Sequence, residues 1–586
     1  MGAILFKKVD YTLLKLIEDI DVGEIGLPEI QRPFVWPNTK VRDLFDSMFR
    51  GFPIGYLLLW ANGLPNSHRQ IGGNEKQRVP HLLIVDGQQR LTSLYAVIKG
   101  IPVLRENFKK EKIVIAFRPN DCHFDVCDVT IQRNPEFIPD ISEVWNMGIG
   151  HIKYIRGFIK KLRETREVSE EEEDQISENI DQLYDLHNYP FTAMELSASV
   201  GEESVAEVFV RINSKGTPLN QADFILTLMS VFWDEGRKEM EKFCYDTRKP
   251  AEGSTPSPFN YHIQPDPDEL LRTSVAYGFR RARLQFVYNI LRGKDLKTEQ
   301  FSIEERDRQF HVLQAAQEKM LDLVNWHDFL KAIRSAGYIN QFMIASKISL
   351  LYVYAFFLIG KYDYLVDHKS LREVIARWFF TAALTRRYTG SQETIMEEDL
   401  HRLDNVSSAE GFINTLEQIM KDTLTEDYWK IALPNDLVTS NSRSPAMLAF
   451  YASQVLLDAK ALFSNLPVSE LLNPAITSVK SGVERHHLFP KGYLQTLNLT
   501  NIKDTNQVAN ITYVEWGDNT NISDMNPEEY YPRYKEKYSR EVLNKMHYWH
   551  ALPDDWQSKP YVQFMDERRK LMAQLIKDGF ETIAGG

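Results

Sequence analysis

The chain has 586 residues, of which 43% are apolar and 26% charged, the composition of a folded protein rather than a disordered or collagen-like one. At roughly 150 residues per domain, we expect about two to four domains. The 69 basic and 81 acidic side chains leave a net charge of -12, which excludes a general electrostatic attraction to nucleic acid. Any binding to DNA would need a local basic patch.

The cysteine content and the apolar runs indicate the cellular compartment of the protein. The three cysteines, Cys122, Cys127 and Cys244, argue against a disulfide framework and favour a reducing cytoplasm. The apolar run at the start is too short for a signal peptide. The most apolar stretch, 348–359, is shorter than the ~20 residues that span a membrane, so we expect a buried helix and no membrane partner.

The first 100 residues mix short apolar runs with Gly and Pro punctuation. The runs in EIGLPEIQRPFVW, FPIGYLLLW and HLLIVDGQQR predict buried strands, and the periodic segments VRDLFDSMF and LTSLYAVIKG predict helices. Ser169 and Glu172 are spaced as a capping box ahead of an acidic helix. A short apolar run at 204–213 precedes a turn-rich segment and a helix that begins at Gln221.

Two breaker segments divide the rest of the chain. The segment 249–269 contains five prolines, which helix interiors and central strands reject, so it predicts a boundary or a long loop. From 269 to about 432 the pattern is helical. A second breaker, TSNSRSPAM at 439–447, precedes a last unit with short strands and Asn-rich turns. The prediction is an α+β, mainly helical protein with domains at 1–248, 249–438 and 439–586.

The sharpest motif is VERHHLFPKGYL at 483–494. His487 is followed by Pro490, then by Asn510 at the start of an apolar run and by Asn519 nine residues later. Phosphodiester hydrolysis needs a base with a pKa near neutrality, which histidine provides, and a divalent cation that stabilises charge on the phosphate. A histidine pair alone is more often a core or surface feature, but this spacing favours a metal-dependent nuclease.

A second motif, LLIVDGQQRLTSLYAVI at 82–98, runs from an apolar strand through Asp86 and Gly87 into an amphipathic helix. A strand, a tight turn and a helix N-terminus present backbone N–H groups and a favourable dipole to an anion. Arg90 adds a guanidinium suited to phosphate. Asp-Gly turns are common, so this motif is weak by itself. The absence of a G-x-x-x-x-G-K-[ST] loop excludes a P-loop ATPase.

The two motifs together resemble a known family. VERHHLFPKGYL with Asn510 and Asn519 is similar to the HNH endonucleases. The DGQQR turn, EIQRPFVWP, FPIGYLLLW and VFVRINSKGTPLN resemble the N-terminal domain of GmrSD-type, modification-dependent (type IV) restriction endonucleases, and 385–400 resembles that family's helical linker. The resemblance implies a single-chain fusion of a ParB/sulfiredoxin-like nucleotide-binding domain, an α-helical middle region and a C-terminal ββα-metal (HNH) nuclease domain.

The resemblance also implies roles for individual residues. His487 matches the general base, Asn510 the residue that holds its imidazole, and His486 and Asn519 the metal-ligand positions. His486 departs from the Asp or Glu often found there. The positions that would line the nucleotide site, with Asn213 as a further candidate, are Gln31, Arg32, Asp86, Gly87, Gln88, Gln89 and Arg90.

The implied function is cleavage of double-stranded, modified phage DNA, for example DNA with hydroxymethylated or glucosylated cytosine. The expected cofactors are Mg²⁺ or Mn²⁺ and a nucleoside triphosphate that regulates the nuclease. Alternatives are a phosphorothioate-sensing nicking endonuclease and a non-cleaving, nucleotide-gated ParB-like DNA clamp. The basic, aromatic segment 278–297 is a weaker candidate for DNA contact. The sequence leaves open a homodimer, the DNA modification and the preferred nucleotide.

Overall fold

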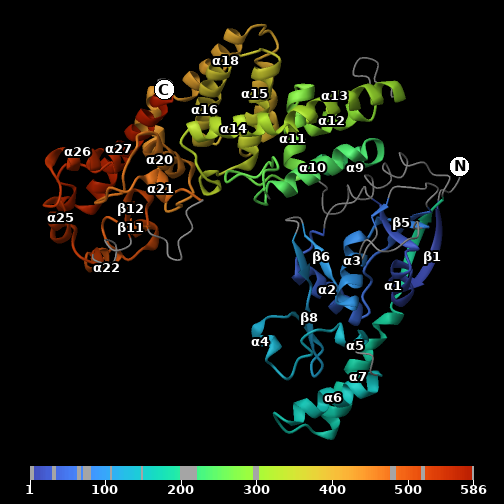
Figure 1. Ribbon diagram of the computed structural model, residues 1–586. Coiled ribbons are helices and arrows are strands. Elements are labelled where there is room, and N and C mark those ends of the chain that lie inside the picture. Colours follow the sequence, from blue (N-terminus) through green and yellow to red (C-terminus); the bar gives the residue numbers. More distant parts are fainter. Residues whose placement is uncertain are drawn as a thin grey trace. The chain divides into compact units, whose positions relative to one another are not determined.

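The computed structural model describes residues 6–28, 34–61, 68–69, 81–105, 109–146, 150–197, 221–251, 253–294, 302–474, 483–515 and 522–583. The chain divides into two compact units, Met1–Arg237 and Lys238–Gly586. Both α-helices and β-strands occur in each unit, and helix predominates over the described residues (Figure 1). The fold is therefore mixed and mainly helical, as the sequence predicts.

A mixed six-stranded sheet forms the centre of the first unit. Its strand order is β1-β10-β3-β5-β2-β4, with parallel pairs β10/β3 and β5/β2 and antiparallel pairs elsewhere. The strands are β1 (Phe6–Thr12), β2 (Ile25–Pro28), β3 (Leu57–Ala61), β4 (His68–Arg69), β5 (Leu82–Asp86) and β10 (Pro190–Leu196). The apolar runs of the first 100 residues thus form strands, as predicted.

Helices and two small hairpins complete the first unit. The hairpins are β6 (Pro102–Leu104) with β7 (Lys110–Lys112) and β8 (Ile115–Arg118) with β9 (His123–Val126). The helices are α1 (Leu13–Asp21), α2 (Asn38–Phe49), α3 (Gln88–Lys99), α4 (Val129–Gln132), α5 (Glu143–Asn146), α6 (His151–Arg163), α7 (Glu170–Tyr184), η1 (Asp185–Asn188) and α9 (Gln221–Phe232).

Both faces of the central strands are buried. Leu57 and Leu59 of β3 join the large core that α1, α2 and α3 cover, whereas Leu58 and Trp60 join a smaller cluster on the other face. Successive side chains of a strand point to opposite faces, so a continuous apolar run is required when both faces are buried. This explains the unbroken LLLW of β3.

Only half of the capping box predicted at Ser169 forms. The Ser169 hydroxyl accepts from Glu172 N at 3.2 Å and caps α7. The Glu172 carboxylate instead accepts from the guanidinium of Arg166, with Arg166 NH1 to Glu172 Oε2 at 2.8 Å. A charge-assisted bond to arginine is stronger than a bond to a backbone N–H, so the carboxylate turns away from the cap.

Helices predominate in the second unit through residue 456. Its first helices are α10 (Asp234–Asp246, which begins in the first unit), α11 (Pro267–Phe279), α12 (Leu284–Leu291), α13 (Ile303–Leu321), α14 (Leu323–Ser335), η2 (Gln341–Met343), α15 (Lys347–Tyr362), α16 (His368–Leu384), α17 (Gln392–His401), α18 (Ala409–Thr423), η3 (Tyr428–Ala432), α19 (Leu433–Asp436) and α20 (Pro445–Leu456). Among the described residues, no helix is long and apolar enough to cross a membrane. The apolar segment 348–359 lies within α15, where every residue from 349 to 360 is buried.

The C-terminal part of the second unit contains the two strands that the structure describes there, β11 (Val483–His487) and β12 (Ile511–Glu515). Its other elements are α21 (Val468–Leu471), α22 (Lys491–Thr496), α23 (Ile502–Thr505), η4 (Val508–Asn510), α25 (Pro527–Lys535), α26 (Arg540–Trp549), η5 (Trp556–Ser558) and α27 (Tyr561–Thr582). Phe580 of α27 packs against Phe380 and Trp429, with ring centroids 5.6 and 6.0 Å away. The segments on either side of the expected 438/439 boundary therefore share one core.

The proline-rich segment 249–269 also packs within the second unit. Trp326 Nε1 donates to Pro258 O at 2.9 Å, and His327 Nε2 lies 2.8 Å from Ser257 O. Both rings belong to α14. The division between the two compact units lies at 237/238, earlier in the chain than the expected boundary at 248/249.

The segment 385–400 forms a network of ion pairs around α17. Asp399 is buried and accepts from Arg387 Nε at 2.7 Å and from the Tyr388 hydroxyl at 2.8 Å. From the same helix, Glu393 pairs with Arg272 of α11 at 2.5 Å. Buried charges are costly unless they are paired, so these carboxylates and cations specify how α17 docks. This gives the motif a structural explanation.

Candidate functional site

The predicted nuclease motif lies on an antiparallel hairpin. β11 pairs with β12 so that His486 is opposite Thr512 and His487 is opposite Ile511. His487 is the last residue of β11, and the Leu-Phe-Pro turn that follows it leads directly into α22. Consecutive residues of a strand point to opposite sides, so the two histidines have different surroundings.

The backbone of the turn after His487 is fixed on all sides. Leu488 N donates to Asn510 O at 2.8 Å, and Leu488 O accepts from the Tyr530 hydroxyl at 2.7 Å. Phe489 N donates to Asn510 Oδ1 at 2.8 Å, and Asn510 Nδ2 donates back to Phe489 O at 2.9 Å. Buried backbone groups that are all hydrogen-bonded give a rigid turn.

The structure corrects the predicted contact of Asn510. Its amide bonds to the backbone of Phe489 and to Thr505 O, rather than to the imidazole of His487. The side chain that bonds to the imidazole is Asn506, whose Oδ1 lies 2.9 Å from His487 Nε2. The sequence contains both amides in DTNQVAN, four residues apart, but the HNH pattern selects only the second.

Asn506 defines the tautomer of His487. An amide oxygen accepts a hydrogen bond, so Nε2 carries the proton and Nδ1 keeps its lone pair. Burial lowers the pKa of His487, while the bond to Asn506 opposes this effect and the nearby Lys491 ammonium adds to it. The imidazole is therefore neutral at pH 7 and has one nitrogen able to accept a proton.

His486 is enclosed rather than open to solvent. It is 2% exposed, and its ring stands edge-on to Tyr530 at a centroid distance of 5.9 Å. An imidazole nitrogen suits ions such as Zn²⁺, Fe²⁺ or Ni²⁺, whereas Mg²⁺ and Mn²⁺ prefer oxygen ligands. The donor at position 486 therefore differs from the oxygen ligands that the expected Mg²⁺ or Mn²⁺ prefers.

The part of the chain that the structure describes contains no ready metal cluster. There, no three or more His, Cys, Asp or Glu side chains come together as ligands. The sequence predicts only two metal ligands, His486 and Asn519, which are fewer than such a cluster contains. Asn519 itself lies outside the described residues.

Arg568 holds the backbone around Asn510 at the start of β12. The sequence did not single this residue out. Its guanidinium is fully buried and donates to Ala509 O at 2.6 Å, Ile511 O at 3.0 Å and His550 O at 3.2 Å. The first two carbonyls flank Asn510. A sequence signal existed, since Arg568 follows Phe564 and precedes Met572 at four-residue spacing on the apolar face of α27.

The second predicted site is the turn between β5 and α3 in the first unit. Gly87 has φ +93°, a left-handed conformation, and a Cβ there would lie 2.4 Å from Leu57 Cδ2. Both the dihedral and the contact require glycine. Asp86 and Gly87 thus lead from β5 directly into α3, as the sequence predicts. The nucleotide-binding roles of Asp86, Gly87, Gln88, Gln89 and Arg90 remain predictions.

The side chains of Gln89 and Arg90 hydrogen-bond to backbone groups of neighbouring segments. Gln89 is 8% exposed, and its Oε1 accepts from Val35 N at 2.9 Å. Arg90 donates to Ile54 O at 2.5 Å and to Tyr56 O at 2.7 Å, with Asp86 Oδ2 at 3.4 Å. Burial lowers the pKa of Arg90, and Asp86 opposes this effect. Arg90 thus has structural bonds in addition to its predicted role toward phosphate.

Several predicted residues fall outside the described part of the chain. These are Gln31, Arg32, Asn213 and Asn519. Because Gln89 holds Val35, it fixes the backbone shortly after the Gln31-Arg32 pair. The arginines of the weaker DNA-contact candidate are partly engaged, since Arg281 Nε pairs with Glu397 Oε1 at 2.5 Å.

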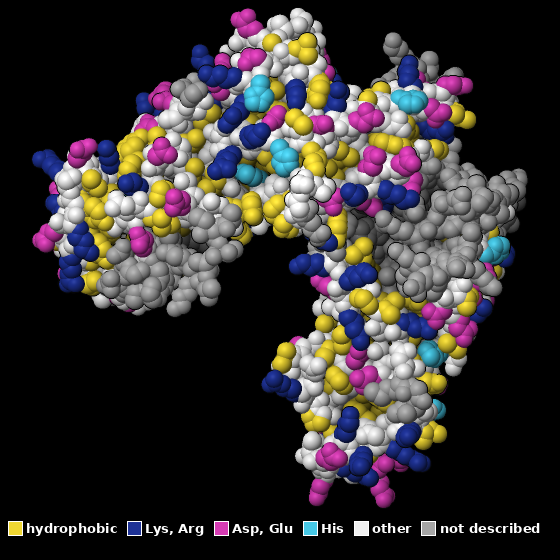
Figure 2. Space-filling view, in the orientation of Figure 1, with side chains coloured by type: hydrophobic (Ala, Val, Ile, Leu, Met, Phe, Trp, Pro, Cys, Tyr) yellow, Lys and Arg dark blue, Asp and Glu magenta, His cyan; other side chains and the backbone are white. Residues whose placement is uncertain are grey.

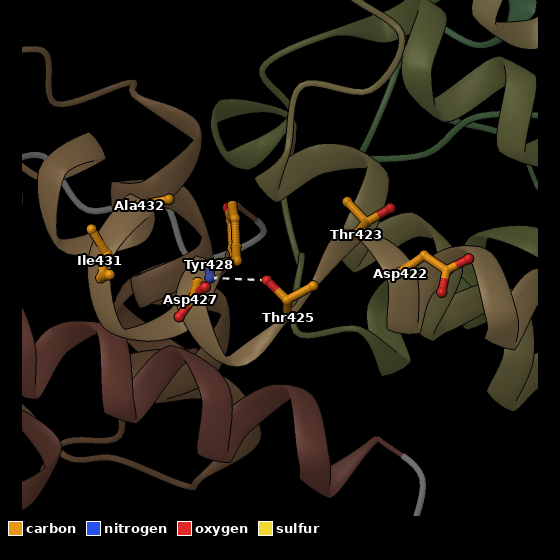
Figure 3. A pocket seen from close by; sticks show the side chains of 7 residues that line it. All are labelled: Asp422, Thr423, Thr425, Asp427, Tyr428, Ile431 and Ala432. Carbon is orange, nitrogen blue, oxygen red and sulfur yellow. Dashed lines mark hydrogen bonds between the residues drawn. The ribbon is translucent and has the colours of Figure 1, made fainter.

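A shallow hollow of about 370 Å³ lies in the second unit, where α18 ends and η3 begins (Figure 3). Tyr428 N donates to Thr425 Oγ1 across its floor at 3.2 Å. The residues that line the hollow are Asp422, Thr423, Thr425, Asp427, Tyr428, Ile431 and Ala432. None of them is a predicted site residue, so the hollow does not mark the candidate nuclease centre.

Comparison with known proteins agrees with the N-terminal motif. A relative from Methanocaldococcus jannaschii, described as an uncharacterized protein, is 22% identical over 563 residues, which cover 88% of this chain and 86% of the relative. Residues 13–230 match the family described as "GmrSD restriction endonuclease, N-terminal domain". The N-terminal region of the chain is therefore of the GmrSD restriction endonuclease type.

Proposed function

We propose that this protein is a metal-dependent DNA endonuclease that acts in the cytoplasm against modified phage DNA, with His487 as its general base. The supporting observation is the His487 imidazole. It is neutral, has its Nε2 proton held by Asn506, and follows a strand that leads into a fully hydrogen-bonded turn. The same chain carries an N-terminal region of a restriction endonuclease family.

The chemistry assigned to His487 is removal of a proton from water. The lone pair of Nδ1 accepts that proton as the water attacks phosphorus, and the bond from Nε2–H to Asn506 stabilises the imidazolium that forms. Asn510 holds the turn, and thereby the position of the strand end, through Phe489. A divalent ion, when bound, would stabilise charge on the phosphate and the leaving oxygen, and His486 and Asn519 are the residues proposed to hold it.

The N-terminal region is proposed to bind a nucleoside triphosphate and to regulate cleavage. Gly87 places the backbone N–H groups of the first turn of α3 where an anion is favoured, beside Arg90. The proposed target is double-stranded DNA with hydroxymethylated or glucosylated cytosine. Phosphorothioate in the backbone is the alternative trigger.

The test is cleavage of matched DNAs that differ by one modification at a time. Wild type and His487→Ala are incubated with unmodified, hydroxymethylated, glucosylated and phosphorothioate plasmids, in Mg²⁺ or Mn²⁺. We expect His487→Ala to lose about 10²- to 10⁴-fold in rate with either ion, while its fold and nucleotide binding persist. Near-normal cutting by the variant would refute the base assignment. Binding without cutting under every condition would favour the ParB-like clamp.

A further inference from the structure

Four cations occur within eight residues of the chain, at the end of α25 and the start of α26. They are exposed and, among the residues that the structure describes, none of them has a carboxylate partner: Arg533, Lys535, Lys537 and Arg540, here called the 533–540 basic surface. By contrast, Lys545 of α26 does have a carboxylate partner, since its Nζ lies 3.3 Å from Glu541 Oε1. Lysine and arginine side chains gather at the end of the second unit that carries α25 and α26 (Figure 2).

The helix dipole accounts for two of these four cations. Arg533 and Lys535 occupy the last turn of α25, where the helix dipole favours a cation. Arg540 is the first residue of α26, where the dipole disfavours one. Lys537 lies between the two helices, with its ammonium 4.4 Å from the centre of the Tyr534 ring. The helix dipole therefore does not account for Lys537 or Arg540, and among the described residues the Lys537 ammonium has only this cation–π contact.

The buried side of α25 is fixed to the candidate nuclease centre. Tyr530 is fully buried and donates to Leu488 O, next to His487, at 2.7 Å. Tyr534 stacks on Phe463 with ring centroids 4.5 Å apart. The aromatic residues of α25 thus face inward and anchor the helix, while the cations interleaved with them face solvent.

We propose that the 533–540 basic surface binds the phosphate backbone of duplex DNA and holds it for the centre at His487. This inference rests on the proposed nuclease function. Duplex DNA carries one negative charge per about 1.7 Å of its axis, so a surface of cations without carboxylate partners complements its charge. In the chain from 530 to 540 only Glu536 is acidic, although the whole protein has a net charge of -12. The electrostatic attraction to DNA would therefore come from this surface and not from the charge of the whole protein.

The experiment measures DNA binding separately from cleavage. The affinity of full-length His487→Ala for a duplex of about 30 base pairs is measured by fluorescence anisotropy without divalent metal, across a salt titration. Replacement of all four cations by alanine in that background should weaken binding at least about tenfold at 0.1 M salt. It should also reduce the slope of log K against log[salt] by up to about 3.6, at about 0.9 per phosphate contact.

A matched variant controls for the change in net charge. Lys331, Lys369, Lys421 and Lys430 are exposed lysines on other helices of the same unit, and their replacement by alanine should leave the slope unchanged. If the four-fold variant of the basic surface fails to fold, the double variant Lys537→Gln/Arg540→Gln is used, with an expected slope change of up to about 1.8.

The outcomes separate the two proposals. An unchanged slope and affinity in the folded surface variants overturns the role of the surface, even if wild type cuts DNA. Reduced affinity and slope support it, even if wild type cuts none of the plasmids and the nuclease proposal fails. If size-exclusion chromatography shows that the variant changes self-association while DNA binding is intact, the surface is instead an interface between copies of the chain, and the DNA proposal is wrong.

Discussion

Asn506 Oδ1 accepts a hydrogen bond from His487 Nε2 at 2.9 Å, and this single contact determines which imidazole nitrogen is free to act as a base. Asn510, four residues later, shapes the neighbouring turn instead. Two amides of one short segment therefore divide two tasks: one orients the imidazole, and the other fixes the backbone that follows it. Hydrogen-bond partners that orient metal-ligating histidines matter by about 10- to 100-fold, and we expect an effect of that size for a histidine that acts as a base.

We predict that Asn506→Ala lowers the rate of DNA cleavage by about 10- to 100-fold with little change in folding. Asn506→Asp should act differently, because a carboxylate beside the imidazole raises its pKa. A base works in its neutral form, so the acid limb of the pH–rate profile should move to higher pH in this variant. The measurement is the cleavage rate from pH 5 to 9, with the exposed Gln495→Ala as the control. An acid limb that does not move would contradict the contact.

We predict that Arg568→Met destabilises the second unit. The substitution leaves the buried carbonyls of Ala509, Ile511 and His550 without their donor, at about 1–3 kcal/mol for each unsatisfied group. Removal of a buried charge offsets part of this cost. Thermal unfolding should therefore begin at a lower temperature than in wild type. The neighbouring Lys570→Met, which changes an exposed side chain of the same helix, is the control, and equal effects of the two would contradict a special role for Arg568.

We predict that the N-terminal turn regulates cleavage through bound nucleotide. Gln89→Leu removes the bond to Val35 N and loosens the backbone after Gln31 and Arg32, so the Kd for nucleotide should rise by roughly tenfold. The dependence of DNA cleavage on nucleotide should shift by the same factor, since the linkage acts through binding. The measurement is cleavage across a nucleotide titration at constant metal. Wild-type cleavage that stays flat while nucleotide binds would show that the sites are not coupled.

We predict that His550 makes the second unit sensitive to acid. Burial lowers the pKa of His550 to about 3, while Thr512 Oγ1 and Lys460 O hold its two nitrogens. As pH falls below about 6.5, the unfolded chain takes up a proton that the folded chain refuses. The stabilisation is complete above that pH and is lost toward pH 3, by up to about 1.4 kcal/mol per pH unit.

The measurement for His550 is the unfolding midpoint temperature between pH 7.5 and 4.5. His550→Gln lacks the titrating group, so the decrease from its own value at pH 7.5 should be smaller than the decrease in wild type. Carboxylates that titrate in the same range affect both proteins alike. Identical decreases would show that the ring at position 550 is not held in its neutral form.

The sequence by itself determined the elements that depend on local pattern. Apolar runs bounded by turn formers predicted β3 and β5, helical periodicity predicted α2, α3 and the helices from 267 to 423, and the Asp-Gly turn predicted the start of α3. These are confirmed because hydrophobic period and turn chemistry act over a few residues. The roles of Gln31, Arg32 and Asn519 remain predictions.

Only the tertiary structure decided which side chains meet. It assigned the imidazole of His487 to Asn506 rather than Asn510, and it made the Glu172 carboxylate a partner of Arg166 instead of a cap. It also showed that Arg568, on α27, holds the backbone of the hairpin at Ile511, which lies 57 residues earlier in the chain. Hydrogen-bond partners follow from distance and direction in the folded chain, and sequence spacing fixes those only within a turn or a single helix.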